Sequence, residues 1–220
     1  HALVRRQRQM CIRDRISCDK VLISIGRKPY TFGLNLVEAG VQTDSKGFII
    51  TKDNFQTSAE NIFAIGDCKL GPMLAHKASE EGTALAEIIV GQVGHVNFDT
   101  IPSVVYTAPE VASVGKTEEE LKSLGLKYKV GKFPFTANAK AKVMHETLGF
   151  VKILSDANSD KVLGVHMIGP DVGNMIAELA LAMEFGASSE DIARTCHAHP
   201  TLTESIKEAA LNVEKRAIHI

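Results

Sequence analysis

The sequence lacks the long apolar runs and the charge excess that mark membrane proteins and nucleic-acid-binding proteins. No stretch approaches the ~18 consecutive apolar residues of a transmembrane helix. The formal net charge is −1 over 220 residues, which argues against a general affinity for nucleic acid or anionic membranes. With 45% hydrophobic and 23% charged residues, the chain can still build a substantial core. We therefore expect a soluble protein of one large or two small domains, with no membrane and no nucleic acid as partner.

The sequence also lacks the usual signatures of disulfide chemistry, nucleotide binding and nucleophilic hydrolysis. Its four cysteines, Cys11, Cys18, Cys68 and Cys196, form neither a C-x-x-C nor a C-x4-C pair. We expect free thiols in a reducing compartment, with a packing role. No G-x-G-x-x-G, G-x-x-x-x-G-K-S/T or G-x-S-x-G is present. A Gly-rich phosphate loop and a nucleophile elbow are therefore excluded from this sequence.

Residues 1–15, HALVRRQRQMCIRDR, are strongly basic and show neither a helix period nor a strand period. A nucleic-acid-binding arm and an Arg-rich targeting peptide both agree with this charge. However, the segment contains no Ser and no initiating Met, and it joins a predicted strand abruptly. Its sequence resembles translated sequencing-adapter DNA. We interpret residues 1–15 as a non-native segment, an artefact unrelated to the remainder of the chain.

From Ile16 onward the pattern is that of an α/β domain. Short apolar runs at 21–25, 48–50 and 61–65 predict buried strands. The third run ends in Gly66-Asp67, and a carboxylate at the carboxyl end of a buried strand lies where open α/β sheets bind ligands. Asp67 is therefore a candidate binding residue, and a plain loop cap is the alternative.

A helix is predicted over residues 74–90, with Gly91 closing its C-terminus. Its apolar and small side chains recur at helical spacing and predict a packed face; they are Ala78, Gly82, Leu85 and Ile89. The first turn of such a helix has free N–H groups and a positive potential, and can hold an anion or a polarised carbonyl.

Beyond the polar stretch 91–100 the order of elements changes, and we place a domain boundary there. Residues 117–125 predict a helix opened by a Thr117-x-x-Glu120 capping box. The other predicted elements are strands at 103–106, 111–114, 128–135, 150–154 and 162–168, and helices at 174–185, 188–194 and 203–219. This order predicts an α+β domain in which helices cover one face of an antiparallel sheet.

The stretch 196–204, CHAHPTLTE, brings an imidazole, a proline and a carboxylate together. Histidine has an ordinary pKa of about 6.5, so His199 oriented by Glu204 can act as a general base. Alternatively, Thr201 and Glu204 form a capping box, and His-Pro is an extended dipeptide before a helix. A metal site is not expected, because no second Cys/His/Asp cluster has zinc-like spacing.

Five separated stretches carry a family resemblance. They are VLISIGRKP (21–29), QTSAENIFAIGD (56–67), GPMLAHKA (71–78), PSVVYTAPE (102–110) and CHAHPTLTE (196–204). In this order and spacing they resemble the dihydrolipoamide dehydrogenase family of flavoprotein disulfide oxidoreductases. The resemblance extends from about Ile16 to the C-terminus.

The resemblance implies a role for each residue of the last stretch. His199 corresponds to the catalytic base, which takes a proton from a dihydrolipoamide thiol so that the thiolate can attack the enzyme disulfide. Glu204 corresponds to its dyad partner, and Pro200 to a cis-proline that aims His199. His197 corresponds to a structural position.

The resemblance also implies binding residues for FAD and NAD. Asp67 corresponds to the carboxylate that binds a ribityl hydroxyl of FAD. The segment that lays backbone N–H groups along the flavin pyrimidine edge corresponds to Met73, Leu74, Ala75 and His76. Gly26 corresponds to a backbone contact with the nicotinamide cofactor.

Complete members of the family carry a strand-GxGxxG-helix for FAD, a C-x4-C redox disulfide and a second Gly-rich turn for NAD, and none of these occurs here. We therefore interpret the chain as a C-terminal fragment. Residues 16–28 are the last strand of the NAD-binding domain, 29–97 the C-terminal part of the FAD-binding domain, and 98–220 the dimerisation domain. Because the family's base completes the active site of the other subunit, we expect the isolated chain to be inactive.

By the same resemblance, the expected partners are a second subunit in a homodimer and the lipoamide-bearing acyltransferase of a 2-oxo acid dehydrogenase complex. The expected location is the bacterial cytoplasm or the mitochondrial matrix. Two alternatives remain open. In the first, the chain is a fragment of a related enzyme, either another disulfide reductase or a soluble transhydrogenase. In the second, it is a non-catalytic dimerisation module. The Ala75–Ala78 and Cys196–His199 stretches favour lipoamide.

Overall fold

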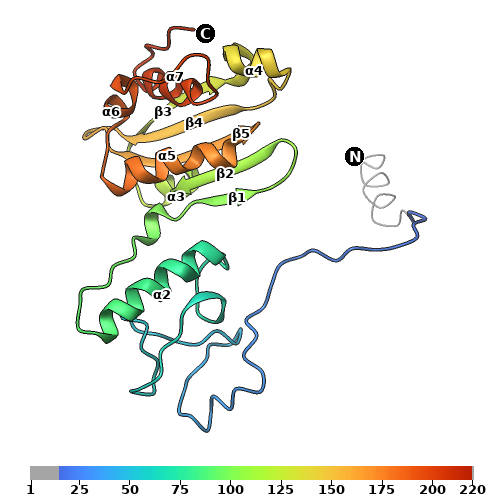
Figure 1. Cartoon of the computed structure of the whole chain (residues 1–220), viewed down its shortest axis with the longest axis vertical. Helices are drawn as coiled ribbons and strands as arrows, with labels where there is room; N and C mark the ends of the chain where they lie inside the picture. The colour runs from blue at the N-terminus through green and yellow to red at the C-terminus, as the bar shows by residue number, and fades with distance from the viewer. Residues whose placement is uncertain (1–14, 220) are drawn as a thin grey trace, which may run out of the picture.

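The computed structural model describes residues 15–219, and the basic segment up to residue 14 lies outside the described residues. Figure 1 shows two packed parts, joined through the segment that follows α2 (Ala75–Ile89), and an extended strand-free arm that leads to the N-terminus. The C-terminal part contains a sheet with helices, as an α+β domain should. No helix in the described range has the length and apolar content to cross a membrane.

The C-terminal part is built on one five-stranded sheet of order β1-β2-β5-β4-β3, antiparallel throughout. Its strands are β1 (Ser103–Val105), β2 (Glu110–Gly115), β3 (Tyr128–Pro134), β4 (Phe150–Asp156) and β5 (Val162–Gly169). All five were predicted, and β4 and β5 pair as an antiparallel hairpin.

One face of the sheet forms the core. A cross-strand row of four buried side chains shows this most directly; in register order it is Phe133, Val151, Met167 and Ala112. Strand side chains alternate between faces, so the residues between them point to the other face, where Val130 and Val111 are about 40% exposed. The sequence alternation therefore determines which face of the sheet forms the core.

Helices cover the core face, as the sequence predicts, with one exception. The helices of this part are α3 (Glu118–Ser123), α4 (Ala139–Met144), α5 (Val172–Glu184), α6 (Ser189–Arg194) and α7 (Glu204–Val213). Helix α3 lies on the opposite face of the sheet, where Glu118 accepts hydrogen bonds from Tyr128 and Lys152. Helix α5 packs on β2 and β5, and α7 packs on β3 and β4 (Figure 1). The capping box of α3 is confirmed, because Thr117 Oγ1 accepts the Glu120 N–H while Glu120 Oε2 accepts the Thr117 N–H.

Two predictions for this part need correction. Helix α7 ends at Val213 rather than near His219, since Lys215 has a positive φ of 58° and the backbone N–H groups of Ile218 and His219 turn back to the Glu208 carboxylate. Helix α4 was not predicted. It depends on Asn138, whose side chain accepts the Ala141 N–H at its start.

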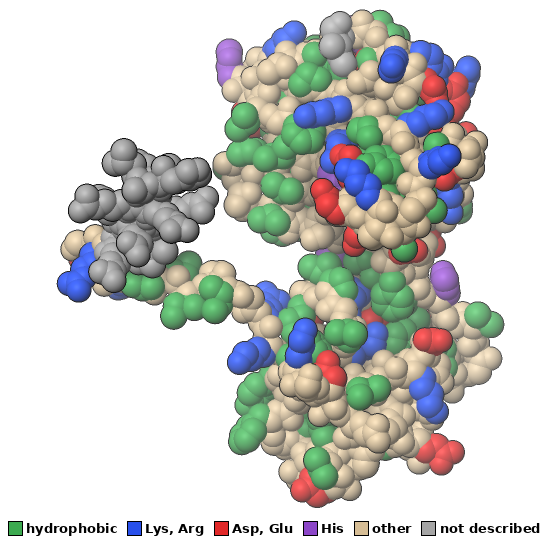
Figure 2. Space-filling view, turned by 180° about the vertical axis from the view of Figure 1, so that it is seen from behind, with side chains coloured by type: hydrophobic (Ala, Val, Ile, Leu, Met, Phe, Trp, Pro, Cys, Tyr) green, Lys and Arg blue, Asp and Glu red, His purple; other side chains and the backbone are tan. Residues whose placement is uncertain are grey.

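The N-terminal part contains α2 and the short 3-10 turn η1 (Gly66–Cys68), but none of the three predicted strands. Residues 48–50 and 61–65 make only isolated bridges, and 21–25 makes none. The apolar side chains of residues 21–25 are exposed instead of buried: Val21 is 79% and Ile25 92% exposed. They lie along the arm that Figure 2 shows apart from the body. A buried strand needs neighbouring strands to satisfy its backbone, and the described residues supply none.

Helix α2 was predicted almost to the residue, and Gly91 follows it with a φ of 80°. Its predicted packed face is only partly correct. Ala78 and Gly82 do lie close to Gly66 and Ile65, but Ile89 is 63% exposed. The buried positions of the helix are Lys77, Glu81 and Ala84.

Candidate active site

The loop between α6 and α7 holds the predicted base and its carboxylate together. His199 Nδ1 and Glu204 Oε1 are 2.9 Å apart, and the His199-Pro200 peptide is cis. The other oxygen, Glu204 Oε2, accepts the Thr201 N–H at 2.8 Å. The base hypothesis and the capping alternative are therefore both represented, since one carboxylate orients the imidazole and also fixes the backbone beside it.

The predicted capping box is correct for Glu204, which binds the Thr201 N–H, but wrong for Thr201 as the N-cap. Thr203, not Thr201, precedes the first residue of α7. The Thr201 hydroxyl donates to the Ala198 carbonyl at 2.7 Å instead of accepting a helix N–H. Two hydrogen bonds of Thr201, with Glu204 and with Ala198, therefore fix the loop on both sides of His199.

The hydrogen-bond pattern assigns the proton on the His199 ring. An ionised carboxylate only accepts hydrogen bonds, so Nδ1 carries the hydrogen and the neutral ring has its lone pair on Nε2. The imidazole side chain is 69% exposed and Nε2 has no partner within residues 15–219. Partial burial alone would raise the pKa of Glu204, but hydrogen bonds from the Thr201 N–H and from His199 hold that pKa below its usual value. The pair can therefore accept a proton from a molecule arriving at the surface.

His197, two residues earlier, occupies a different environment. Its side chain is only 4% exposed, and Nε2 and Nδ1 face Glu178 Oε1 at 2.9 Å and the Thr195 carbonyl at 3.0 Å. The hydrogen bond with Glu178 raises the pKa of His197, against the opposing effect of burial. Both ring nitrogens are engaged, so His197 is placed to link α5 to the loop rather than to exchange protons.

Sequence reasoning missed two further side chains that hold this loop. Lys207 Nζ donates to the Ala193 and Thr195 carbonyls at 2.7 and 2.8 Å, where α6 ends. Asn138, which is 4% exposed, donates from Nδ2 to the Thr201 carbonyl at 3.0 Å. The only sequence signal for Lys207 was its position three residues after Glu204 on the same predicted helix. Asn138 had no sequence signal.

A small cleft of about 50 Å³ beside the base contains a second His–Glu pair that the sequence did not reveal. His219 Nδ1 and Glu208 Oε1 are 2.7 Å apart. Glu208 lies one helical turn after Glu204 on α7, so both carboxylates face the same cleft. Within the described residues, no group of three or more His, Cys, Asp or Glu side chains is arranged to bind a metal.

The residues predicted to bind cofactors gather in the other part of the molecule. Asp67 lies in η1, which packs against α2; its side chain is 48% exposed and is 3.8 Å from Arg27. Arg27 follows Gly26, which has a φ of 113° and open space around it. The structure therefore brings the Gly26 segment next to Asp67.

The start of α2 is the second element of this group. Its N-cap, Leu74, offers no side-chain hydrogen bond, so the first-turn N–H groups have no side-chain cap. Met73 and Leu74 are half-buried, whereas Ala75 and His76 are exposed at the residue level. His76 Nε2 lies 2.8 Å from the Pro102 carbonyl. An uncapped helix N-terminus beside an exposed carboxylate fits a ligand with both carbonyl and hydroxyl groups, as FAD has.

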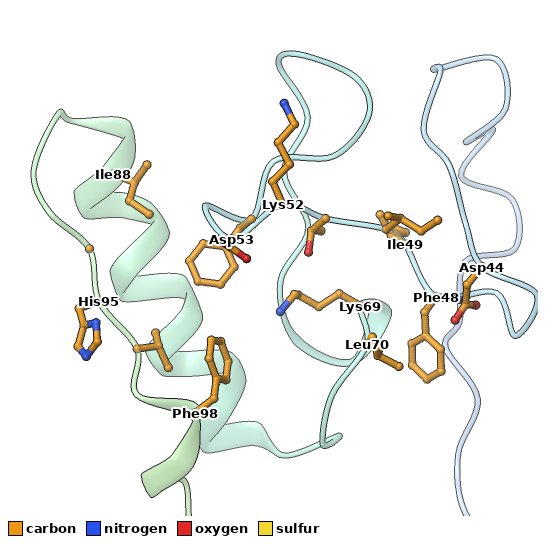
Figure 3. A pocket seen from close by; sticks show the side chains of 15 residues that line it. Asp44, Phe48, Ile49, Lys52, Asp53, Lys69, Leu70, Ile88, His95 and Phe98 are labelled. Atoms are coloured by element: carbon orange, nitrogen blue, oxygen red, sulfur yellow. The ribbon is translucent and has the colours of Figure 1, made fainter. Parts of the chain in front are cut away.

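The His199–Glu204 pair and the residues predicted to bind cofactors lie apart within this chain. Figure 1 shows α6 and α7 at the end of the molecule opposite to α2, with the sheet between them. A third feature, a cavity of about 570 Å³ between residues 44–55 and 88–98, contains none of the predicted site residues (Figure 3). The predicted catalytic pair and the predicted cofactor-binding residues therefore lie in separate parts of one chain.

Comparison with known protein families shows which family the chain belongs to. Residues 101–210 match the pyridine nucleotide-disulphide oxidoreductase dimerisation domain, and residues 7–82 match the pyridine nucleotide-disulphide oxidoreductase domain. The chain belongs to the pyridine nucleotide-disulphide oxidoreductases. The fold prediction for the dimerisation domain is thereby confirmed. The second match begins inside the basic segment 1–15, most of which lies outside the described residues.

Several curated relatives of this oxidoreductase chain are dihydrolipoyl dehydrogenases. It is 54% identical over 205 residues to the mitochondrial dihydrolipoyl dehydrogenase of Pisum sativum, covering 93% of this chain and 41% of the relative. It is 55% identical to that of Trypanosoma brucei brucei, covering 90% and 42%. The leghemoglobin reductase of Glycine max is 55% identical, with 89% and 38% covered. The chain thus spans about two fifths of the length of the curated relatives it matches.

Solved structures agree with this assignment. LpdA from Mycobacterium tuberculosis superposes with a TM-score of 0.80 at 29% identity, over 86% of this chain and 41% of that one. The flavoprotein disulfide reductase RclA from Escherichia coli gives 0.78 at 27% identity, over 86% and 44%. The same arrangement of elements is therefore present in flavoprotein disulfide reductases.

Proposed function

We propose that this chain is the base-bearing and dimerisation part of a dihydrolipoyl dehydrogenase, a flavoprotein that oxidises dihydrolipoamide to lipoamide with NAD⁺ through FAD and a redox disulfide. The observation that carries the proposal is the His199–Glu204 pair. It has a fixed Nδ1–H, a free Nε2 and an exposed ring, in a chain about 54% identical to dihydrolipoyl dehydrogenases.

In the proposed reaction, neutral His199 takes the proton of a dihydrolipoamide thiol on Nε2. The resulting thiolate attacks one sulfur of a disulfide and displaces the other sulfur as a thiolate. Glu204 stays ionised and stabilises the imidazolium that forms, while its contact with Thr201 prevents the carboxylate from following the ring. Imidazolium then returns the proton to a leaving sulfur or to water. The disulfide lies outside this sequence, which has no C-x4-C.

The cofactor part of the proposal concerns η1 and the start of α2. Asp67 would accept a hydrogen bond from a ribityl hydroxyl of FAD. Backbone N–H groups of the 73–76 segment, in Met73, Leu74, Ala75 and His76, would face the flavin pyrimidine edge, and Gly26 would contact NAD through its backbone. FAD, when bound, supplies the two-electron relay between the dithiol and NAD⁺. The uncapped first turn of α2 and the exposed Asp67 carboxylate support this placement.

The proposed partners follow from the same relationship. The dimerisation domain of residues 98–220 would pair with a second copy, so that His199 serves the cofactor group of the other subunit. This explains why the two halves of the site lie apart in one chain. Lipoamide would arrive on the acyltransferase of a 2-oxo acid dehydrogenase complex, in the bacterial cytoplasm or the mitochondrial matrix.

The test is a fusion protein that completes the sequence. Residues 16–220 would be joined to the N-terminal portion of the Pisum sativum enzyme that this chain does not cover, and purified with FAD. We expect NAD⁺-dependent oxidation of dihydrolipoamide. His199→Gln should lower it about 10²- to 10⁴-fold, the usual contribution of a general base. The matched control is His145→Asn, an exposed histidine with a φ of 58° that Asn also adopts.

Each alternative gives a different outcome in this assay. A related disulfide reductase would favour another disulfide, such as glutathione disulfide, over lipoamide. A non-catalytic dimerisation module would give a stable dimer without turnover on any disulfide. Equal activity of the His199→Gln and His145→Asn proteins would refute the assignment of the base.

A further inference from the structure

A buried charged cluster joins α2 to the η1 turn. Glu81 on α2 is completely buried. Its Oε2 accepts the Gly66 N–H at 2.6 Å, and its Oε1 lies 3.0 Å from Lys69 Nζ and 3.2 Å from Lys77 Nζ. One carboxylate therefore binds a backbone group and two ammonium groups simultaneously.

The cluster binds both polar backbone groups of Gly66. While Glu81 accepts its N–H, Lys77, which is 1% exposed, donates from Nζ to its carbonyl at 3.4 Å. Gly66 has a φ of 70°, and an added Cβ would lie 3.2 Å from Ala78 Cβ. The turn that carries Asp67 thus lies directly on α2, with little space to shift.

Lys69 is fixed from two further directions. Its ammonium lies 5.4 Å from the centre of the Phe55 ring and 5.2 Å from that of Phe98, within cation–π range. Figure 3 shows Lys69 extended toward Phe98. Burial alone would raise the pKa of Glu81, but hydrogen bonds from Gly66 and Lys69, and the charge of Lys77, hold that pKa below its usual value. The carboxylate is therefore ionised at neutral pH.

A buried ion cluster adds little net stability, because desolvation opposes the Coulombic attraction. It does fix the relative position of the groups that it bonds. We propose that Glu81 is a positioning residue, which holds the Gly66–Asp67 turn against the first two turns of α2. The Asp67 carboxylate and the uncapped N–H groups of α2 then form one rigid edge for a bound ligand. This inference rests on the proposed role of Asp67 in binding FAD.

The test compares Glu81→Gln and Glu81→Asp with Glu80→Gln in the 220-residue chain. Glu80 is the neighbouring, exposed carboxylate, and its removal changes the net charge equally. The Glu81→Gln variant leaves two buried lysines without a counter-ion, whereas Glu81→Asp keeps the charge on a side chain one methylene too short to reach Gly66. The first readout is hydrogen exchange of individual backbone amides. The second is FAD affinity, from flavin fluorescence anisotropy, of the same variants in the fusion protein described above.

We expect the Gly66 amide to exchange at least about tenfold faster in both Glu81 variants, as the loss of a hydrogen bond to a charged group implies. Amides of the second half of α2 should keep their protection, and FAD affinity should fall at least about tenfold. Glu80→Gln should match the parent chain in both readouts.

Two results would overturn the positioning role. One is an unchanged Gly66 amide in both Glu81 variants. The other is an equal loss of protection along all of α2, which means that Glu81 acts on helix stability alone. If the Gly66 amide responds but FAD affinity of the fusion protein is unchanged when Asp67 is replaced by Ala, the positional role stands and the FAD assignment of Asp67 fails instead.

Discussion

Gly131 in β3 allows α7 to lie close to the sheet, and its replacement by Ala should displace that helix. A Cβ at this position would lie 2.0 Å from the Ala209 carbonyl oxygen and 2.7 Å from both Val213 Cγ2 and the Val213 nitrogen. Two of these atoms are backbone, so no side-chain rotation relieves the overlap. Because Glu204 is the first residue of α7, displacement of the helix also moves the carboxylate that orients His199.

The expected cost can be estimated from this overlap. Overpacking of a core typically costs 1–3 kcal/mol, and contacts with helix backbone place Gly131→Ala at about 3 kcal/mol or more. For a domain of roughly 120 residues, about 4 °C of melting temperature corresponds to 1 kcal/mol, so we expect a drop of about 12 °C. The control is Gly125→Ala. Gly125 has a φ of 68° and no atom within 4 Å of an added Cβ, which implies a cost of about 1–2 kcal/mol from backbone conformation alone.

The assay is thermal unfolding of both variants followed by far-UV circular dichroism, together with the ring NMR signals of His199. Gly131→Ala should melt well below Gly125→Ala, and the His199 signals should shift only in the former. If Gly131→Ala melts at the same temperature as the parent chain, the close packing of α7 on β3 is not present in solution.

Three further predictions concern the loop that carries the base. Because the folded pKa of Glu204 is lowered, its contribution to stability is present above its unfolded pKa of about 4.3 and is lost as pH falls through the folded value. Glu204→Gln should therefore flatten the acid limb of stability measured by urea unfolding. The folded pKa of His197 is raised, so its contribution is complete below about 6.5 and is lost as pH rises through the folded value. Glu178→Gln should remove that alkaline loss and lower the pKa of His197 followed by NMR, whereas an unaltered titration would contradict the pairing. Asn138→Ala should cost about 1–3 kcal/mol in urea unfolding, because it leaves the Thr201 carbonyl and the Ser205 hydroxyl without their partner, and a cost near zero would show that water replaces the amide.

Much of the C-terminal fold followed from local sequence signals. The capping box at Thr117 begins α3 where predicted. The apolar alternation of 128–135 located β3, and the apolar run 162–168 located β5, each to within a residue. The same kind of signal was wrong for residues 21–25, where an apolar run indicates that a segment favours burial but does not provide the neighbouring strands. At α7, the helical pattern continued past Val213, whereas the actual end depends on Glu208 binding the backbone of the returning tail.

The sequence by itself determined the family, the order of the elements and the pairing of His199 with Glu204, since these depend on residues close together in the chain. Only the tertiary structure showed that Asn138 binds the Thr201 carbonyl, that Glu178 engages His197, and that Glu81 and Lys77 are buried against Gly66. Charged residues on a helix predict a solvent-exposed surface. A carboxylate is stable in the interior only where distant cations and N–H groups reach it, and the fold alone brings those groups together.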